Sequence, residues 1–484
     1  MKFGSPKDYL MYKNENISHI FHISFYHPQE YNYLMAKINF KSQTINMTVG
    51  NPVGHLLKFA LPMLIGNVFQ QVYNLVDSII VGKYVGADAL AAVGATNSIC
   101  FLFFALCNGI GNGGGIVTSQ MFGTGDEKKV KSCISNTAYI MLCMSLVVGT
   151  LALFLSHPIL SLMKTPENIM QDSLSYLQIQ CIGLIFVALY NFASSMLRAM
   201  GDSETPLYFL IFSCLLNTGL DLLFVRVFNM GVFGAAVATV ISQFVSGALC
   251  LGFALKCNSY FKLTKENLRP DKEIIFQAIK IGVPLSLQFS LIAISCMALQ
   301  SVVNGYGAVA VAAFTATSRI EQLIHQPYQT LGSSLSTYCG QNYGARKNDR
   351  VILGFRKSML IMFLFSVAML PFMQFLGEPI VRIFVDDKDV IEMGAKALRI
   401  TSWFYVFLGV IYVVRGVLNG IGDAVFALIN GIVEVICRLT FPIIFTGMAI
   451  FGLWGIWWSV GITWFLSGLT AYLRYIQYKK KALC

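Results

Sequence analysis

The chain carries one sequence pattern twice, at a fixed separation. Residues 86–99 read GADALAAVGATNSI and residues 307–320 read GAVAVAAFTATSRI, so Gly86 and Gly307 stand 221 positions apart. The same offset relates further pairs downstream: Gln120 with Gln341, Gly123 with Gly344, Gly201-Asp202 with Gly422-Asp423, Gly231 with Gly452, and Gly234 with Gly455. Only the first helix slips by one position, since Pro62 matches Pro284. A duplication of this length predicts two halves of similar structure.

The composition places both halves in a membrane. Of 484 residues, 56% are hydrophobic and only 12% are charged, whereas soluble domains carry about 25% charged residues. Uncharged stretches such as 439–460 are long enough, at about 1.5 Å per residue, to cross a hydrocarbon core of about 30 Å. Such spans begin near residues 56, 90, 133, 174, 205, 232, 274, 311, 354, 397, 425 and 452. We therefore predict an all-α integral membrane protein with twelve transmembrane helices in two six-helix bundles, related by a pseudo-twofold axis along the membrane normal.

The repeat also divides the chain. We expect an N-terminal extension over residues 1–46, an N-lobe over 47–256 with spans 1–6, a cytoplasmic linker over 257–273, and a C-lobe over 274–484 with spans 7–12 and a basic tail. The extension lacks the layout of a signal peptide and has no counterpart in the second copy. We expect it to be disordered, or to precede the true start at Met47. Its histidines, His19, His22 and His27, lack a Cys or carboxylate at metal-ligand spacing.

Lysine and arginine in the short loops predict the orientation. Eighteen lie in the loops after even-numbered spans and in the C-terminal tail, and seven lie on the other side. We therefore expect both termini in the cytoplasm and a multi-pass protein of the plasma (inner) membrane. The net charge of +11 then reflects topology. Nucleic acid is not an expected partner, because no basic stretch is interleaved with stacking aromatic residues on a soluble domain.

The sequence lacks the motifs of several kinds of metal site and enzyme. The twelve cysteines are scattered without a C-x-x-C pair, so neither a disulfide framework nor a zinc site is predicted. No P-loop, G-x-S-x-G or H-E-x-x-H motif occurs, which disfavours the alternative of a membrane-embedded enzyme and predicts no organic cofactor. The run GIGNGGG at residues 109–115 lacks the Lys-Ser/Thr of a phosphate loop, and in its apolar setting it predicts close helix packing or bending.

In the first copy, two acidic residues lie inside predicted spans, where an ionisable side chain is costly unless it faces a cavity or a partner. Asp77 and Asp221 each come 15 residues after a proline, Pro62 and Pro206, in spans that run in the same direction. Both carboxylates therefore reach about 22 Å along their helices, in the outer half of the membrane. The 221 offset matches Asp221 with Pro442, so the second copy lacks this acid.

Two polar residues reach the level of these carboxylates. Asn217 precedes Asp221 by four residues and shares its helix face, and Thr239 lies at about the same depth in the next span. Carboxylate, amide and hydroxyl oxygens suit a sodium ion, and two neighbouring carboxylates in a low dielectric suit proton uptake. A purely architectural hydrogen bond between helices is the alternative reading. The two copies of the repeat argue against this alternative, because they differ at these positions. The 221 offset matches Asn217 with Arg438, and the slipped first helix matches Asp77 with Leu299.

Other polar residues within spans supply further candidates. In the C-lobe, Glu434 and Arg438 are one turn apart, which predicts a structural ion pair. For Glu321 with Arg319, pairing with other helices and attraction of cations both remain open, while His325 reads as a packing histidine and Arg415 has no assigned role. Candidates to line a substrate cleft are Gln70, Tyr73, Asn74, Tyr190, Asn191, Gln243 and Gln288.

At these residues the chain resembles the multidrug and toxic compound extrusion (MATE) transporters. The resemblance rests on Pro62 with Asp77, the Arg198-x-x-Gly201-x-x-x-x-Pro206 pattern, Asn217 with Asp221, and GAAVAT ending at Thr239, and it covers residues 51 to 477. It implies two bundles around a central cleft and efflux of cationic organic compounds, driven by inward flow of H+ or Na+. We expect small organic cations and the lipid bilayer as partners, no cofactor beyond the coupling ion, and a monomer.

The resemblance also assigns roles to single residues. In the archaeal and DinF-like pattern the coupling cation binds at the positions matching Asp77, Asn217, Asp221 and Thr239, and Pro62 matches the proline at which the first span bends. NorM-like members carry acidic ligands at the positions matching Ile292 and Leu408, so a C-lobe sodium site of that type is not expected. A lipid-linked precursor or polysaccharide flippase of the same superfamily is the rival; it would have more spans and a cleft rich in arginine. The substrate and the choice of H+ or Na+ stay open.

Overall fold

The computed structural model describes residues 44–483, and within this range the chain is helical with no β-strand. The predicted extension over residues 1–46 lies outside the described residues except for its last three. The first half of the repeat consists of α3 (Pro52–Tyr84), α4 (Ala87–Thr124), α5 (Glu127–Leu162), α6 (Glu167–Ala199), α7 (Glu204–Asp221) with its continuation η2 (Leu222–Val227), and α8 (Gly231–Cys257). The second half, after the short η3 (Ser259–Phe261), consists of α9 (Lys272–Asn304), α10 (Ala308–Gly344), α11 (Asn348–Arg382), α12 (Lys388–Ser402), α13 (Tyr405–Gly420), α14 (Ala424–Gly447), η4 (Gly452–Trp454) and α15 (Gly455–Leu483).

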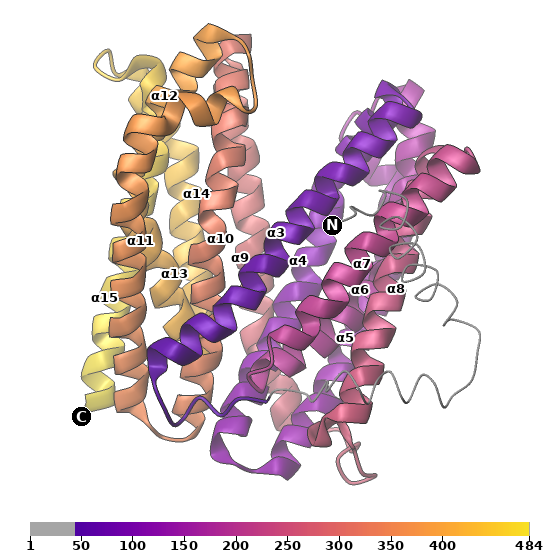
Figure 1. Cartoon of the computed structure of the whole chain (residues 1–484), viewed down its shortest axis with the longest axis vertical. Coiled ribbons are helices and arrows are strands. Elements are labelled where there is room, and N and C mark those ends of the chain that lie inside the picture. The colour runs from indigo at the N-terminus through magenta and orange to yellow at the C-terminus, as the bar shows by residue number, and fades with distance from the viewer. Residues whose placement is uncertain (1–43, 484) are drawn as a thin grey trace, which may run out of the picture. The chain divides into compact units, whose positions relative to one another are not determined.

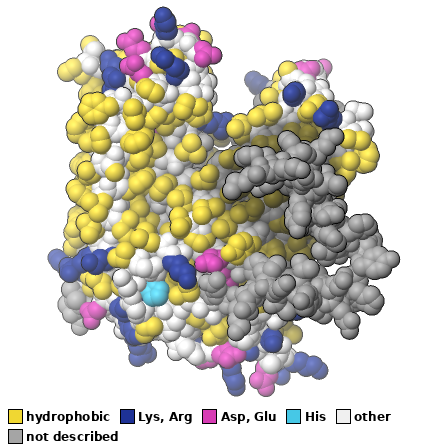
Figure 2. Space-filling model, in the orientation of Figure 1, with side chains coloured by type: hydrophobic (Ala, Val, Ile, Leu, Met, Phe, Trp, Pro, Cys, Tyr) yellow, Lys and Arg dark blue, Asp and Glu magenta, His cyan; other side chains and the backbone are white. Residues whose placement is uncertain are grey.

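These helices correspond to the twelve predicted spans. In the described part of the chain, nine helices are long and apolar enough to cross a membrane, and α12 with α13, which meet at a 54° bend, form a tenth span. The other two, α10 and α15, have 37 and 29 residues and are long enough to span, but polar side chains lower their hydropathy. Figure 2 shows apolar side chains over the middle of the visible face, with charged side chains gathered at both ends.

The two halves form two groups of helices, α3–α8 and α9–α15 (Figure 1). Their boundary is made by the first two helices of each copy, because α4 packs against α9 and α10, and α3 packs against α10. The glycine run at 109–115 lies on this boundary. A Cβ atom on Gly113 would come within 2.6 Å of the backbone of Gly282, and one on Gly109 would come within 2.0 Å of Ser286 Oγ. The prediction of close helix packing at this run is confirmed.

A second backbone contact joins α4 and α10 at the end of the helices that carries Lys128, Lys129, Arg346 and Lys347, here called the basic end. A Cβ atom on Gly123 would lie 1.9 Å from the carbonyl oxygen of Gln341, and one on Gly344 would lie 1.8 Å from the carbonyl oxygen of Gln120. These four residues, here called the glutamine seam, are partners in the 221-residue repeat. The pseudo-twofold relation therefore appears in individual contacts.

The side chains of the seam follow the same symmetry. Gln120 Nε2 donates to the carbonyl of Gly420 at 2.8 Å, and Gln341 Nε2 donates to the carbonyl of Ala199 at 3.0 Å. Both acceptors end a helix, α13 and α6, and they too stand 221 positions apart. In each lobe a glutamine side chain thus donates a hydrogen bond to a backbone carbonyl at a helix end of the other lobe, where the helix itself offers no donor.

The chain entering α3 strengthens the same junction. The side chain of Met47 is fully buried, and its backbone nitrogen donates to Gln341 Oε1 at 2.8 Å. Its carbonyl accepts from Asn342 Nδ2 at 3.2 Å and from Arg350 Nη2 at 3.0 Å. Ile45 N donates to the carbonyl of Met200 at 3.1 Å, just past the end of α6. This short segment therefore connects the two lobes at the basic end.

The close approach at Gly123 makes a stability prediction. We expect Gly123→Ala to lower the free energy of unfolding by about 1–3 kcal/mol, because the added methyl would collide with a backbone carbonyl that cannot rotate away. The matched control is Gly94→Ala in the same helix, where a Cβ atom meets nothing within 4 Å; there the better helix propensity of alanine adds up to about 1 kcal/mol. Titration with sodium dodecyl sulfate from mild detergent measures both. Equal stability of the two variants would contradict the backbone contact.

Candidate functional site

The structure brings Asp77 and Asp221 together between α3 and α7. The two helices pack against each other, and the two carboxyl groups lie within hydrogen-bond reach. Asp221 has no exposed surface, and Asp77 is half-buried. Two carboxylates this close, away from water, repel each other unless a proton or a cation lies between them.

Asn217 and Thr239 lie beside this pair. Asn217 is 2% exposed, and its Nδ2 donates to Thr239 Oγ1 at 3.4 Å. With the amide turned over, its nitrogen donates to Asp221 Oδ2 at 3.0 Å and its oxygen accepts from the backbone nitrogen of Thr239 at 3.3 Å. The turned amide satisfies more partners, so we assign that orientation. The four residues named from the sequence thus form one cluster, here called the N-lobe acid site.

The N-lobe acid site has unused acceptors. One oxygen of each carboxyl group, Asp77 Oδ1 and Asp221 Oδ1, is buried without a hydrogen-bond partner in the described part of the chain. Buried polar atoms nearly always have a partner. The available donor set of carboxylate, amide and hydroxyl oxygens fits a proton or a hard monovalent cation. Among residues 44–483 no three side chains of His, Cys, Asp or Glu are grouped to hold a metal ion.

Two features of the N-lobe acid site had no signal in the sequence. Tyr176 of α6 is 8% exposed and lies close enough to interact electrostatically with both carboxylates, as Tyr73 of α3 does. In addition, α7 ends at Asp221 and continues as the π-helix η2. π-Helical segments are rare and occur often at functional sites, because they insert one residue and loosen the helix locally. Tyr73 was a candidate for the substrate cleft; its place is beside the acids.

Pro62 lies in the interior of α3, which continues unbroken from Pro52 to Tyr84. Proline has no N–H to donate to the carbonyl four residues earlier, here that of Lys58, so the helix has one hydrogen bond fewer at this point. The missing hydrogen bond makes α3 easier to bend at Pro62, where the sequence predicts a hinge. The helix contacts α7 of the N-lobe and α10 of the C-lobe.

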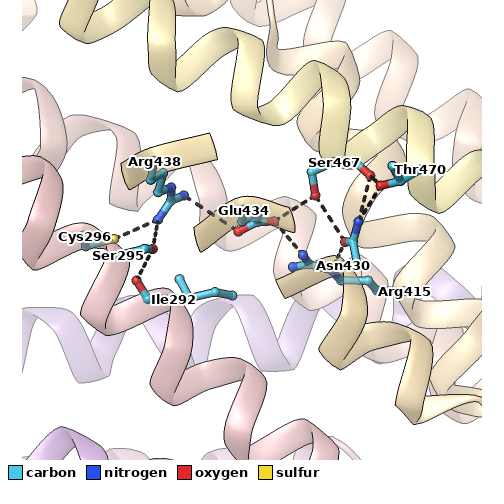
Figure 3. A network of polar contacts seen from close by, with 9 residues as sticks. All are labelled: Ile292, Ser295, Cys296, Arg415, Asn430, Glu434, Arg438, Ser467 and Thr470. Atoms are coloured by element: carbon cyan, nitrogen blue, oxygen red, sulfur yellow. Dashed lines mark hydrogen bonds and ion pairs between the residues drawn. The ribbon is translucent and has the colours of Figure 1, made fainter. Parts of the chain in front are cut away.

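The C-lobe holds a chain of charged residues (Figure 3). Glu434 accepts from Arg415 Nη2 at 2.5 Å, and its second oxygen lies 3.9 Å from Arg438 Nη2. The predicted pair of Glu434 with Arg438 is thus the longer of two contacts, and the main partner comes from α13. Arg415 Nε also donates to Asn430 Oδ1 at 2.7 Å, and Ser467 Oγ donates to Glu434 at 3.1 Å. We call these five residues the C-lobe charge network.

The other sequence candidates are dispersed. With its amide turned, Gln288 accepts from Arg415 at 3.1 and 3.2 Å, so it contacts the C-lobe charge network. The hydroxyl of Tyr190 donates to the carbonyl of Pro206 at 3.1 Å, a structural bond between α6 and α7. Gln70, Asn74 and Arg319 are exposed, whereas Asn191, Gln243, Glu321 and His325 are half-buried. At the positions of the C-lobe acids of NorM-like proteins the chain has Ile292 and Leu408, of which Leu408 is buried in the apolar core.

Comparisons with known proteins agree with this architecture. A family model described as MatE matches residues 62–223 and again residues 284–444, which are the two copies of the repeat. The probable multidrug resistance protein YpnP of Bacillus subtilis is 32% identical over 441 residues, covering 90% of this chain and 98% of the relative. The multidrug export protein MepA of Staphylococcus saprophyticus is 25% identical, covering 86% and 92%. A solved structure of a multidrug resistance MATE family transporter of the MOP superfamily, in an outward-facing conformation, superposes with a TM-score of 0.85 at 23% identity, covering 91% of this chain and 98% of that one.

The C-lobe charge network makes a second stability prediction. We expect Glu434→Gln to cost about 3–5 kcal/mol, because it leaves two buried guanidinium groups without their shared counter-charge. The matched control is Glu378→Gln, which breaks the exposed 3.4 Å pair with Arg399 and should cost less than about 1 kcal/mol. Detergent unfolding titrations of both variants measure the difference. A cost for Glu434→Gln no larger than the control's would show that the network is not holding the lobe together.

Proposed function

This chain belongs to the MatE family, and from that premise we propose that it is a secondary antiporter that exports cationic or amphipathic organic compounds from the cell in exchange for an inward proton or sodium ion. The observation that carries the proposal is the N-lobe acid site: two carboxyl groups from different helices, Asp221 buried and Asp77 half-buried, each with one buried oxygen that has no partner among residues 44–483. A membrane protein without such a use for them would pay several kcal/mol to keep these groups in its interior. The names of the relatives support the transport of drugs.

The geometry supports an alternating-access mechanism. The glutamine seam closes the basic end, which the positive-inside rule assigns to the cytoplasm, and Figure 2 shows the two groups of helices separated at the opposite end. In this state the N-lobe acid site takes its cation from outside. A cation on Asp77 and Asp221 cancels the charge that attracts an organic cation, so the two compete for the same lobe.

Pro62 supplies the mechanical step of the proposal. When the cation removes the repulsion between Asp77 and Asp221, the contact between α3 and α7 changes, and α3 bends at its weakest point. The bend narrows the N-lobe and releases the organic compound to the outside. Reorientation then requires the glutamine seam to open, which delivers the cation to the cytoplasm.

Neutralising the acids tests the coupling. We expect Asp77→Asn and Asp221→Asn each to lower gradient-driven dye efflux from proteoliposomes at least tenfold, because an amide neither takes up a proton nor balances a cation. The exposed Asp88, in the first turn of α4, gives the control variant Asp88→Asn. Separate pH and sodium gradients identify the coupling ion. If folded Asp77→Asn and Asp221→Asn proteins still exported dye at the normal rate, this mechanism would be excluded.

Restoring the missing hydrogen bond tests the hinge. We expect Pro62→Ala to bind the coupling cation as before but to export dye roughly tenfold more slowly, because the bend now breaks a regular helix bond. Pro52→Ala in the same helix is the control, since Pro52 occupies the first turn, where no bond is lost. Parallel cation-binding and efflux measurements separate the two effects. Normal efflux by the Pro62 variant would move the hinge elsewhere, with η2 as the next element to test.

A further inference from the structure

Two lysines occupy equivalent positions of the repeat, near the basic end of the first helix of each copy. They are Lys58 in α3 and Lys280 in α9, which the slipped first helix matches with each other as it matches Pro62 with Pro284. Each lysine comes four residues before the proline of its helix. Both side chains are exposed. The proposed transport function gives neither lysine a role.

Neither ammonium group has a partner among residues 44–483. No acidic residue stands three or four positions from either lysine, where residues of one helix share a face. No hydrogen bond or ion pair joins either ammonium group to another described side chain or carbonyl. Other lysines of the basic end are engaged: Lys131 pairs with Glu127 at 2.7 Å, and Lys347 donates to the carbonyl of Thr48 at 3.0 Å. Lys58 and Lys280 are therefore available to an anion from outside the chain.

Both lysines point away from the body of the protein. The residues two positions before and after each lysine are buried, and they are Leu56 and Ala60 in α3 and Ala278 and Gly282 in α9. Two residues of an α-helix correspond to a rotation of about 200°. The lysines thus lie opposite the faces by which α3 and α9 pack, on the side that faces the surrounding membrane.

An exposed apolar stripe accompanies each lysine. Side chains at one position before the lysine and at three and seven positions after it share its side of the helix. These residues, here called the lipid stripes, are Leu57, Leu61 and Ile65 in α3 and Ile279, Val283 and Leu287 in α9. All six are 38–58% exposed, so each stripe presents a continuous apolar surface. The pattern of one cation followed by an apolar stripe is repeated in both copies.

The lysines lie at the level where a bilayer changes from headgroup to hydrocarbon. Lys58 comes six residues after the start of α3 and Lys280 eight residues after the start of α9, about 9 and 12 Å along the helices. No further charged residue follows in α9, and the next one in α3 is Asp77. A lysine at this depth extends its apolar stem along the helix and places its ammonium group among the lipid phosphates.

Both helices cross from one lobe to the other. At the basic end α3 lies against the C-lobe, where Ser334 Oγ of α10 donates to the carbonyl of Leu56 at 2.9 Å, and further along it packs against α7 of the N-lobe (Figure 1). The helix α9 crosses in the opposite sense. Its cap residue Asp271 donates from its backbone nitrogen to Asn136 Oδ1 of the N-lobe at 2.8 Å, and the helix also packs against α14 of the C-lobe. The two lysines therefore mark the boundary between the lobes.

We propose that Lys58 and Lys280 each bind the phosphate of an anionic phospholipid from the leaflet at the basic end, with an acyl chain along the adjoining lipid stripe. The headgroup is anionic, because the excess of lysine and arginine at this end repels the positive group of a zwitterionic lipid. The two lipids anchor the crossing helices at one depth in the membrane. The inference goes beyond the proposed transport function and requires only that the chain spans a bilayer.

Lipid counting tests the proposal. The full-length chain in mild detergent is titrated with palmitoyl-oleoyl-phosphatidylglycerol or with the phosphatidylcholine of the same chains, and the retained lipids are counted by native mass spectrometry. We expect two phosphatidylglycerol molecules to bind about fivefold more tightly than phosphatidylcholine, as one unpaired lysine at each headgroup predicts.

Variants assign the two lipids. Lys58→Gln and Lys280→Gln should each remove one of the two tightly bound molecules, and the double variant should remove both. The arginine variants Lys58→Arg and Lys280→Arg keep the charge and should keep both lipids. The matched control is Lys265→Gln, an equal loss of charge in the exposed linker at the same end, which should also keep both.

Chemical labelling of the wild type gives the answer if a variant does not fold. Phosphatidylglycerol should protect Lys58 and Lys280 from acetylation by an N-hydroxysuccinimide ester, with no protection of Lys265, and phosphatidylcholine should protect none of the three. Peptide mass spectrometry measures the modified fraction at each lysine.

Three results would overturn the lipid sites. They are equal binding of the two lipids by the wild type, the same lipid loss in Lys265→Gln as in the two site variants, and displacement of the lipids by glycerol phosphate at an equal phosphate concentration, which would assign the lysines to small anions. The transport function is judged separately. If the wild type retained both lipids and yet exported no dye, the proposed transport function would fail and the lipid sites would stand.

Discussion

Two backbone contacts at the glutamine seam hold the lobes together at the basic end. Gly123 touches the carbonyl of Gln341 and Gly344 touches the carbonyl of Gln120, at distances that no side-chain carbon could tolerate. Each contact is accompanied by a hydrogen bond from a glutamine to a helix end of the opposite lobe. The two hydrogen bonds are related by the 221-residue repeat.

The rest of the structure is arranged around this junction. The helices that make it, α4 and α10, also border the helices that carry the polar groups of the interior, and α3 runs from the seam to the N-lobe acid site. On α3, Pro62 lies between the seam and the N-lobe acid site. The entering segment at Met47 connects the start of that helix to both lobes.

The duplication supplied the frame, and the chemistry then diverged between the copies. In the N-lobe, one carboxyl oxygen of Asp77 and one of Asp221 are buried without a donor among residues 44–483. In the C-lobe, two guanidinium groups share one carboxylate. Burial makes both arrangements expensive, because neither charge can be screened by water.

The sequence by itself determined the repeat, the helical spans and the depth of each polar residue along its helix. Counting 15 residues from Pro62 and from Pro206 was enough to predict that Asp77 and Asp221 lie at the same depth, because the rise per residue of a helix is a local property. The tertiary structure alone decided which residues are neighbours at a given depth. It made Arg415 a nearer partner of Glu434 than the predicted Arg438, added Tyr176 to the acid site, and placed Gln288 beside Arg415. Those outcomes depend on the rotation and packing of whole helices, which many distant contacts set together and no short stretch of sequence encodes.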